Sequence, residues 1–586
     1  MWKSLWRLSE FASKHCVLLL LGVLCFLAAR VFEAQVPLYL REGIDRMNAG
    51  NTDVTAPVLG IIGVVIARFF IVSAARYSVR QAGLRIAFDA RARLFATLQK
   101  QGSAFFNRYG VGDMMTRAVA DISLIQRFFS MGTILVVILL FATVVGFFYM
   151  WQLSPDLTIL ILPPMPFVVW YAYRSSREMG VTSLAVQERM SQMSAQVQEN
   201  LSGIRTIQAM VQEDNEVNRF AATNQAYANS FFQQARINSL MTAVMPSMVA
   251  ICTITILGYG GSLVLAKEIT IGTFVAFFTY VGMVVQPFRV AGFIVNLVQR
   301  AAVASDRLFE VLDMAPEHPD EPSGTTPVSI SGELSFNDLV YTYPGATTPA
   351  LDGVSLTVSA GETIAIMGRV GCGKTTLMRQ LVRLADPPRG TVDVDSHDVL
   401  DYPLAQLRAQ IALVPQDAFL FGDTLGNNIT YDDSSRGLNE IWQAADAADL
   451  RGTLERFPDG LDTMVGERGV TLSGGQKQRT TLARGLIRHA PVLLLDDCFA
   501  SVDTATEEHI LRHLRELRAN QTTLMVSHRV STARHADRII VLDRGKIVEQ
   551  GSHAQLLAAD GIYADLERIQ REGTQDGTQG GAQENE

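Results

Sequence analysis

The chain has 586 residues, of which 48% are hydrophobic and only 18% are charged. This composition excludes a disordered protein and indicates a component that lies in a membrane. The net charge is -8, and such an acidic balance argues against a general nucleic-acid binder, so no nucleic-acid partner is expected. The five cysteines form no CxxC pair, which argues against a zinc site or a disulfide framework.

Long apolar stretches fill the first half of the chain and predict six transmembrane helices. Two stretches, at residues 17–40 and 56–78, are interrupted by a few charged residues. The other four contain no charged residue and are each long enough to span a bilayer: residues 128–155, 157–173, 237–266 and 269–288. The chain therefore should insert into a lipid bilayer as a multi-pass protein.

Basic residues collect after the second and the fourth of these stretches, whereas the opposite connections are short and nearly balanced in charge. The positive-inside rule places both basic segments, the N-terminus and everything after the sixth span in the cytoplasm. Both segments keep a helical apolar rhythm. The spanning helices are therefore expected to continue well beyond the bilayer as long cytoplasmic extensions.

Polar residues at membrane depth are the candidates for a substrate cavity. Arg30 and Glu33 lie three residues apart on one helical face, so a structural ion pair and a substrate contact are both open interpretations. Arg68 and Gln286 lie inside apolar stretches, and Arg289 follows the sixth one. We regard these three as candidate cavity residues.

A change of composition divides the chain. The membrane domain is predicted at residues 1–310, a polar, proline-rich linker at 311–330, and an α/β domain at 331–570. Residues 571–586 have little apolar content and are predicted to be a disordered tail. Buried strands of the α/β domain are predicted at residues 363–367, 411–414, 492–495, 523–526 and 538–542.

The strongest chemical signal runs from Gly368 to Thr375 with the sequence GRVGCGKT, between a predicted strand and a predicted helix. This is a phosphate-binding P-loop in its required context, and it predicts ATP as the ligand. Backbone N–H groups would surround phosphate oxygens, Lys374 would bring a positive charge, and Thr375 would offer a hydroxyl to Mg²⁺. The residues assigned to nucleotide binding here are Gly368, Gly371, Gly373, Lys374, Thr375 and Thr376.

Asp496 follows the apolar run at residues 492–495, where a carboxylate can hold the Mg²⁺ shell. Between the P-loop and Asp496 lies Leu472-Ser473-Gly474-Gly475-Gln476. This pentapeptide resembles the signature of ABC transporter ATPases. The resemblance covers nearly the whole chain, because six spans with two long extensions and one ATPase domain form the layout of an ABC exporter half-transporter.

The resemblance implies an α-helical membrane domain followed by an α/β P-loop ATPase domain, and it assigns further roles. Tyr343 resembles the aromatic residue that stacks on adenine, and Gln416 the Q-loop glutamine that senses Mg²⁺. Asp503 resembles the D-loop aspartate, and His528 the histidine that contacts the γ phosphate. Each has a simpler alternative: Tyr343 packs, Gln416 caps a strand, Asp503 caps a helix, and His528 is a surface histidine.

The signature implies a dimer. In this family the signature of one subunit covers the ATP on the other subunit's P-loop, and Ser473, Gly474, Gly475 and Gln476 would contact that nucleotide. One chain with one P-loop and one signature cannot close a site on itself. A second ABC half-transporter is therefore the expected partner.

Asp497 departs from the family pattern, which has a glutamate at this position to orient the attacking water. Aspartate is shorter by one methylene, which withdraws the carboxylate by roughly 1 Å or more. Asp497, His528 and Gln416 are the candidate catalytic residues, but hydrolysis at this chain's own P-loop should be slow. The pattern resembles the degenerate subunit of heterodimeric exporters, whose partner carries the glutamate; a homodimer that tolerates aspartate is the alternative.

Together these expectations predict an ATP-hydrolysing exporter subunit of the bacterial inner membrane. Its substrates, by family analogy, are hydrophobic or amphipathic drugs, lipids or peptides. Three alternatives remain open at this point: an importer that uses the exporter-type fold, a homodimeric exporter, and a regulatory subunit that senses nucleotide.

Overall fold

The computed structural model describes residues 2–51, 53–285, 291–317, 329–466 and 472–580. The chain divides into two compact units, which are described separately. The first comprises Met1–Gln101 with Phe106–His318, and the second comprises Gly102–Phe105 with Pro319–Glu586. The division at His318 lies within the segment predicted as a linker.

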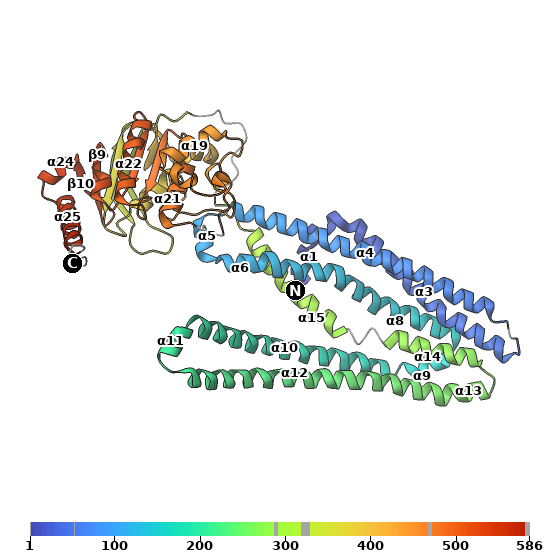
Figure 1. The fold of residues 1–586 in the computed structure, drawn as a ribbon. Coiled ribbons are helices and arrows are strands. Elements are labelled where there is room, and N and C mark those ends of the chain that lie inside the picture. Colours follow the sequence, from blue (N-terminus) through green and yellow to red (C-terminus); the bar gives the residue numbers. More distant parts are fainter. Residues whose placement is uncertain (1, 52, 286–290, 318–328, 467–471, 581–586) are drawn as a thin grey trace. The chain divides into compact units, whose positions relative to one another are not determined.

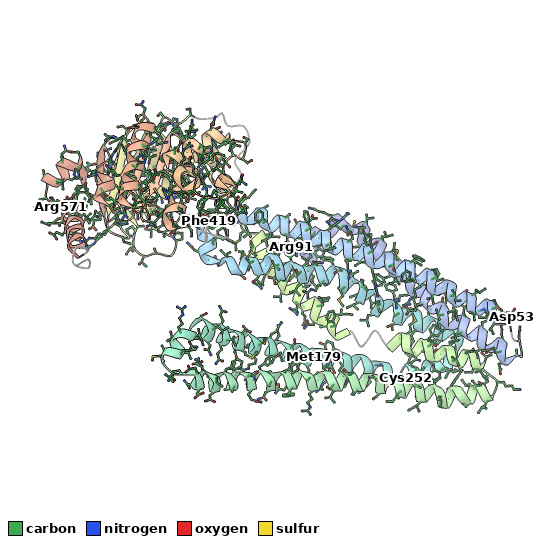
Figure 2. All side chains as sticks on the ribbon, in the orientation of Figure 1. Asp53, Arg91, Met179, Cys252, Phe419 and Arg571 are labelled. Carbon is green, nitrogen blue, oxygen red and sulfur yellow. The ribbon has the colours of Figure 1, made fainter. Side chains whose placement is uncertain are left out.

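Long helices build the first unit. After the short helices α1 (Trp2–Arg7), α2 (Ser9–Ala12) and η1 (Ser13–His15), α3 (Cys16–Asn48) and α4 (Thr55–Gln99) pack side by side (Figure 1). Asp53, labelled in Figure 2, lies in the turn between them and accepts a hydrogen bond from the backbone N of Thr55 at 3.1 Å. This contact satisfies a free N–H at the start of α4.

The third long helical stretch follows α5 (Ser103–Arg108). It consists of α6 (Val111–Thr116), η2 (Arg117–Asp121), α7 (Ile122–Arg127), η3 (Phe128–Gly132) and α8 (Thr133–Leu153). α9 (Pro155–Ile161) is followed by α10 (Pro164–Ser202), with Leu162 and Pro163 between them. Proline lacks a backbone N–H and clashes with the preceding turn, so the predicted fourth span is interrupted here.

α10 and α12 (Glu213–Thr255) pack along each other as a hairpin, with α11 (Ile204–Ala209) near its tip (Figure 1). α12 has 43 residues and is therefore roughly 65 Å long, about twice the ~30 Å hydrocarbon thickness of a bilayer. This length agrees with the predicted extensions. The unit ends with η4 (Ile256–Gly260), α13 (Gly261–Leu265), α14 (Ile271–Val285) and α15 (Ala291–Leu312).

Three helical stretches among the described residues are long and apolar enough to cross a membrane: Lys3–Asn48, Thr55–Gln99 and Val111–Leu153. Two shorter apolar helices lie at Ala250–Leu265 and Ile271–Val284. The three long stretches contain the first two predicted spans and the third up to Leu153, and the count of six stays a prediction.

Charged side chains at membrane depth pair with one another. Arg30 Nη1 lies 2.5 Å from Glu33 Oε2, and Arg68 Nη2 lies 3.0 Å from Glu33 Oε1. The ion-pair interpretation of Arg30 and Glu33 is therefore confirmed, and Arg68 joins them. Gln286 and Arg289, the other candidate cavity residues, lie outside the described residues.

A six-stranded sheet is the centre of the second unit, with the order β10-β9-β3-β8-β7-β6. Its first five members in chain order run parallel, and the last pairs antiparallel with its neighbour. They are β3 (Thr363–Gly368), β6 (Ile411–Val414), β7 (Val492–Asp496), β8 (Thr522–Val526), β9 (Arg538–Asp543) and β10 (Lys546–Gly551). The five predicted strands are confirmed because buried parallel strands form continuous apolar runs.

A smaller antiparallel sheet, with the order β2-β1-β4-β5, was not predicted. Its strands are β1 (Leu334–Tyr341), β2 (Leu351–Val358), β4 (Val392–Val394) and β5 (His397–Asp398). Buried and exposed residues alternate over much of β2, so this strand lacks the continuous apolar run of a central strand.

The helices of this unit are α16 (Lys374–Leu381), α17 (Leu404–Gln410), α18 (Leu425–Ile429), α19 (Leu438–Ala447), α20 (Arg451–Leu454), α21 (Gly474–Leu486), α22 (Thr504–Leu517), α23 (Val530–Ala533), α24 (His553–Ala558) and α25 (Ile562–Gly580). Among them α16, α17, α21, α23 and α24 pack against strands of the central sheet. Two short 3₁₀ turns are η6 (Val399–Asp401) and η7 (Gly460–Asp462). α25 reaches Gly580, so its backbone is helical within the segment predicted as a disordered tail from residue 571. A helix that is already nucleated adds one hydrogen bond for each further residue, even where apolar side chains are missing.

Candidate nucleotide-binding site

The carboxyl ends of four adjacent parallel strands carry the predicted site. β3, β8, β7 and β6 are neighbours in this order, and each is followed directly by a candidate segment. The P-loop follows β3, His528 follows β8, Asp497 follows β7 and Gln416 follows β6. Ligands of open α/β sheets bind outside these ends, so the fold gathers the candidates at one edge.

Glycine is required at two turns of the P-loop. Gly368 has φ +144°, and a Cβ there would lie 2.2 Å from the carbonyl oxygen of Leu542. Gly373 has φ +109°, and its Cβ would lie 2.6 Å from the carbonyl oxygen of Ala350. Any other residue would be strained in both conformation and space. The loop therefore turns tightly into the N-terminus of α16, where free N–H groups can face an anion.

Lys374, the first residue of α16, is buried and folds back over the loop. Its Nζ donates to the carbonyl oxygens of Gly368 at 2.8 Å and Arg369 at 2.9 Å. Both acceptors belong to the loop itself, so the ammonium group is held at the P-loop, where an anion would meet it. This arrangement prepares a fixed positive charge for phosphate.

The candidate metal ligands are Thr375, Gln416 and Asp496, and the first and the last of them are in contact. The Thr375 hydroxyl donates to Asp496 Oδ1 at 3.0 Å. Burial raises the pKa of Asp496 above its ordinary value, and the hydrogen bond from Thr375 opposes this rise. The neighbouring Thr376 Oγ1 lies 3.2 Å from the hydroxyl of Tyr343, whose ring meets that of Tyr341 edge-on at 5.1 Å.

The three candidate catalytic residues lie together. Gln416 Nε2 donates to Asp497 Oδ2 at 3.3 Å, and His528 Nε2 lies 3.9 Å from the same oxygen. Asp497 adopts a left-handed backbone with φ +47°, which short polar side chains tolerate better than most. The side chains from three strand ends therefore converge on one carboxylate.

The signature residues form a separate feature at the start of α21. Ser473 is the N-cap of this helix: its Oγ accepts from the Gln476 backbone N at 3.3 Å, and its own N donates to Gln476 Oε1 at 2.9 Å. A Cβ on Gly475 would lie 2.9 Å from the Ser501 carbonyl oxygen, and one on Gly474 would lie 3.2 Å from Ser501 Cβ. Within the described ranges, no hydrogen bond or ion pair joins Ser473, Gly474, Gly475 or Gln476 to the P-loop.

Asp503 caps α22 and accepts a hydrogen bond from the Thr506 backbone N at 3.0 Å. Hydrogen bonds from Thr506 hold the pKa of this carboxyl below its ordinary value. The helix-cap alternative for Asp503 is therefore observed, and contact with a nucleotide is a separate expectation.

Two family models match the chain: "ABC transporter transmembrane region" over residues 19–288 and "ABC transporter" over residues 351–500. The second match contains the P-loop and the strand that ends at Asp496. The chain belongs to the ABC transporter family. Its ATPase domain and its exporter relatives make it a multi-pass membrane exporter subunit that binds nucleotide and couples ATP hydrolysis to transport.

Curated relatives match this ABC exporter over nearly its full length. A protein named ATP-dependent lipid A-core flippase from Syntrophus aciditrophicus (strain SB) is 32% identical, with 96% of this chain and 94% of that protein covered. A probable multidrug resistance ABC transporter ATP-binding/permease protein, YheI, from Bacillus subtilis (strain 168), is 33% identical, with 99% and 100% covered. A solved bacterial Atm1-family ABC exporter with ATP bound superimposes with a TM-score of 0.77 at 27% identity, with 94% and 98% covered.

Three side chains that support the site of this ABC exporter were missed at the sequence level. Gln478 accepts from the Ser501 backbone N at 2.7 Å, and Arg529 donates to the Val502 carbonyl oxygen at 3.1 Å. Gln570, on α25, donates to the His528 carbonyl oxygen at 2.6 Å. The adjacency of Arg529 to His528 was the one local signal, whereas Gln570 is distant in sequence and lies in a polar run.

Proposed function

We propose that this chain is one half of a heterodimeric exporter of the bacterial inner membrane, with its N-terminus and ATPase domain in the cytoplasm. Its own P-loop site binds ATP and turns it over slowly, and its signature completes the active site on a partner that carries a glutamate. The observation that carries the proposal is an aspartate, Asp497, at the position of the water-orienting carboxylate beside an intact signature.

The geometry around Asp497 supports a site organiser rather than an efficient base. Its Oδ2 is within 3.3 Å of Gln416 Nε2 and 3.9 Å of His528 Nε2, so the carboxylate is engaged by the two loops that flank it. A catalytic carboxylate must reach about 2.6–3.2 Å from the proton donor it activates. Removal of one methylene withdraws the group by about 1 Å, and a misplacement of that size can cost about 100-fold.

The residues present fit ATP with Mg²⁺. Lys374 is positioned for the phosphates, Tyr343 lies at the start of the P-loop helix for the base, and Thr375 and Asp496 present two oxygens 3.0 Å apart. Mg²⁺ prefers such hard oxygen ligands, and it keeps several waters besides one or two protein groups. When bound, the ion supplies positive charge that offsets charge on the phosphates. Thr375, Asp496 and Gln416 would hold it; Gln416 follows β6, the neighbour of the strand β7 that ends at Asp496.

The substrate class rests on the relatives' printed names, a lipid A-core flippase and a multidrug resistance transporter. The first name specifies a lipid and the second specifies drugs. We extend that class to this chain, whose membrane unit exposes many large apolar side chains along its long helices.

The test compares two carboxylates in the native complex, purified through this chain with its partner identified by mass spectrometry. Asp497→Ala is expected to change steady-state ATP turnover only a few-fold, whereas Gln in place of the partner's glutamate should lower turnover by about 10²- to 10⁴-fold. Asp497→Glu should let this chain's own site hydrolyse ATP. Single-turnover hydrolysis, with trapped nucleotide assigned to each chain, measures the effect of all three variants.

A different set of results would overturn the proposal. If the purified complex holds two copies of this chain, and Asp497→Ala removes turnover, the protein is a homodimer that uses aspartate. Transport into inside-out vesicles tests the direction, because an exporter loads them from outside and an importer does not. A complex that binds ATP but moves no substrate would be a regulatory subunit.

A further inference from the structure

Two histidines lie one helical turn apart on the surface of the second unit. His509 and His513 both belong to α22, and residues four apart in sequence lie on the same face of a helix. Their ring centroids are 6.5 Å apart. His509 is exposed to solvent and His513 is half-buried. Histidines at positions i and i+4 of one helix face can bind a single zinc ion, so the spacing indicates a metal site.

The ring nitrogens of this pair are less engaged than those of other histidines. His397 and His553 each have a ring nitrogen within 2.8 Å of an oxygen. Within the part of the chain that the structure describes, His513 has no hydrogen bond or ion pair, and the one charged neighbour of His509 is Asp449. A neutral imidazole binds a transition metal through the nitrogen that carries no proton, so each ring can offer one.

Asp449 is placed to orient the ring of His509. Its Oδ1 lies 3.6 Å from His509 Nδ1, slightly farther than a hydrogen bond. Arg479, on α21, holds this aspartate, because its Nη1 donates to Asp449 Oδ2 at 3.4 Å and also to the Asp449 carbonyl oxygen. A histidine that binds a metal almost always donates its other ring N–H to a carboxylate or a carbonyl, which fixes the tautomer. Asp449 therefore favours the proton on Nδ1 and leaves Nε2 of His509 for a metal.

The two rings have to approach each other only slightly to share one ion. Zinc lies about 2.1 Å from an imidazole nitrogen, so two rings on one tetrahedral ion have centroids roughly 5 Å apart. The observed separation is 6.5 Å, and side-chain rotation can supply the difference because neither histidine is fully buried. The described residues contain no group of three or more histidine, cysteine, aspartate or glutamate side chains placed to hold a metal ion. The site thus has two protein ligands, and water fills the other positions.

We propose that His509 and His513 bind one divalent transition-metal ion, such as Zn²⁺, Ni²⁺ or Cu²⁺, and that Asp449 orients the ring of His509. Imidazole suits these ions, whereas Mg²⁺ prefers oxygen ligands, so this site is separate from the Mg²⁺ site at the P-loop. Arg479 belongs to α21, the helix that begins with the signature. A bound ion therefore links α22, through Asp449, to the signature helix.

The test measures Zn²⁺ binding by calorimetry to the full-length complex, purified without a histidine tag. Nucleotide is left out because ATP itself chelates metal ions. The parent is expected to show a saturable Zn²⁺ site, which His509→Ala or His513→Ala should each weaken by about tenfold or more. His489→Ala is the matched control, because it removes an exposed histidine of the same unit that lies outside the pair, and it should bind Zn²⁺ as the parent does.

Two further measurements identify the ligands. Electron paramagnetic resonance of bound Cu²⁺ should show coupling to two imidazole nitrogens in the parent and to one in either alanine variant. Asp449→Asn keeps the shape of the side chain but removes the charge that orients His509, so Zn²⁺ binding should weaken by about 10- to 100-fold. Millimolar Mg²⁺ should not displace Zn²⁺ from the site.

Other results would overturn the proposal. Zn²⁺ binding that is unchanged in both histidine variants, or that falls equally in His489→Ala, shows that the pair is not the site. Copper coupled to a single imidazole in the parent shows that the two rings do not share an ion. Displacement of Zn²⁺ by equimolar Mg²⁺ indicates oxygen ligands, and unchanged binding in Asp449→Asn rejects the role of Asp449. None of these measurements depends on ATP turnover, so they leave the proposed exporter function untested by their failure.

Discussion

Replacing Lys374 with alanine is expected to lower the affinity of this chain for ATP by about 100-fold. The side chain is held at the P-loop by the carbonyl oxygens of Gly368 and Arg369, so its ammonium group is already ordered before a phosphate arrives. Two of its three N–H groups are donated to these carbonyls, so one remains for phosphate; a charge-assisted hydrogen bond of this kind contributes about 1.5–3 kcal/mol, up to about 100-fold in affinity, and alanine removes it. Photolabelling of this chain by an ATP analogue across a concentration series measures the change.

A second lysine provides the control for this variant. Lys546 Nζ lies 3.0 Å from Asp352 Oδ2 on the surface of the same unit. Exposed pairs of this kind contribute little, so Lys546→Ala removes the same charge without changing nucleotide affinity. Equal photolabelling of Lys374→Ala and Lys546→Ala would place the nucleotide elsewhere.

Ser473→Ala combined with Gly475→Asp is expected to lower ATP turnover of the assembled transporter by about 100-fold or more. Ser473 Oγ accepts the Gln476 N–H, which leaves its own proton free for a phosphate oxygen on the partner's nucleotide. An aspartate at position 475 adds a negative charge at that helix N-terminus, and its Cβ would crowd the Ser501 carbonyl oxygen. Photolabelling of this chain's own P-loop should stay normal, since that loop is unchanged.

The chain contains a second capping box that serves as a matched control. Ser552 caps α24, accepts from the Gln555 backbone N at 3.4 Å, and donates its own N to Gln555 Oε1 at 2.9 Å. The geometry repeats that of Ser473 and Gln476. Loss of either cap costs about 0.5–2 kcal/mol of stability. Ser552→Ala therefore removes a helix cap of the same kind while it leaves the signature unchanged. Comparable turnover in Ser473→Ala and Ser552→Ala would show that Ser473 only caps its helix.

The chemistry of the nucleotide site was largely predictable because it depends on contiguous residues. The P-loop needs glycine at exact positions, and the apolar run that ends at Asp496 is a buried parallel strand. The convergence of Gln416, Asp497 and His528 follows from the order of the parallel strands, which the sequence does not state. The resemblance to ABC transporter ATPases, and no local pattern, predicted that these three residues belong to one site.

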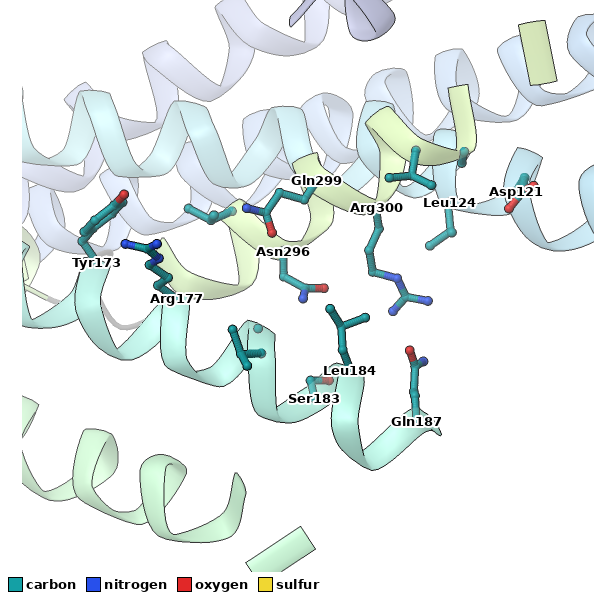
Figure 3. A pocket seen from close by; sticks show the side chains of 15 residues that line it. Asp121, Leu124, Tyr173, Arg177, Ser183, Leu184, Gln187, Asn296, Gln299 and Arg300 are labelled. Atoms are coloured by element: carbon teal, nitrogen blue, oxygen red, sulfur yellow. The ribbon is translucent and has the colours of Figure 1, made fainter. Parts of the chain in front are cut away.

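The parts that were not predicted depend on partners distant in sequence. The small sheet pairs β1 with β4 across more than fifty residues, and β1 and β2 have register shifts that interrupt a simple alternation. In the fourth predicted span the prolines indicated a kink, and the structure goes further: α9 ends at Ile161 and α10 begins at Pro164, an interruption whose extent the sequence does not state. A cavity between α10 and α15 of the membrane unit is lined by residues as far apart in sequence as Asp121 and Arg300, which no local pattern connects (Figure 3).

The two hydrogen bonds that Gln570 makes to the loop at His528 affect where another protein or tag can be fused to this chain. This one amide accepts the Val530 N–H at 2.9 Å and donates to the His528 carbonyl oxygen at 2.6 Å. α25 thus holds the backbone next to His528 in place, although the two segments are more than forty residues apart in the sequence. A fluorescent fusion or affinity tag should follow the final residue, after a flexible spacer. A junction before Gln570 would remove its hydrogen bonds to Val530 and His528, so the backbone at His528 would be less well held.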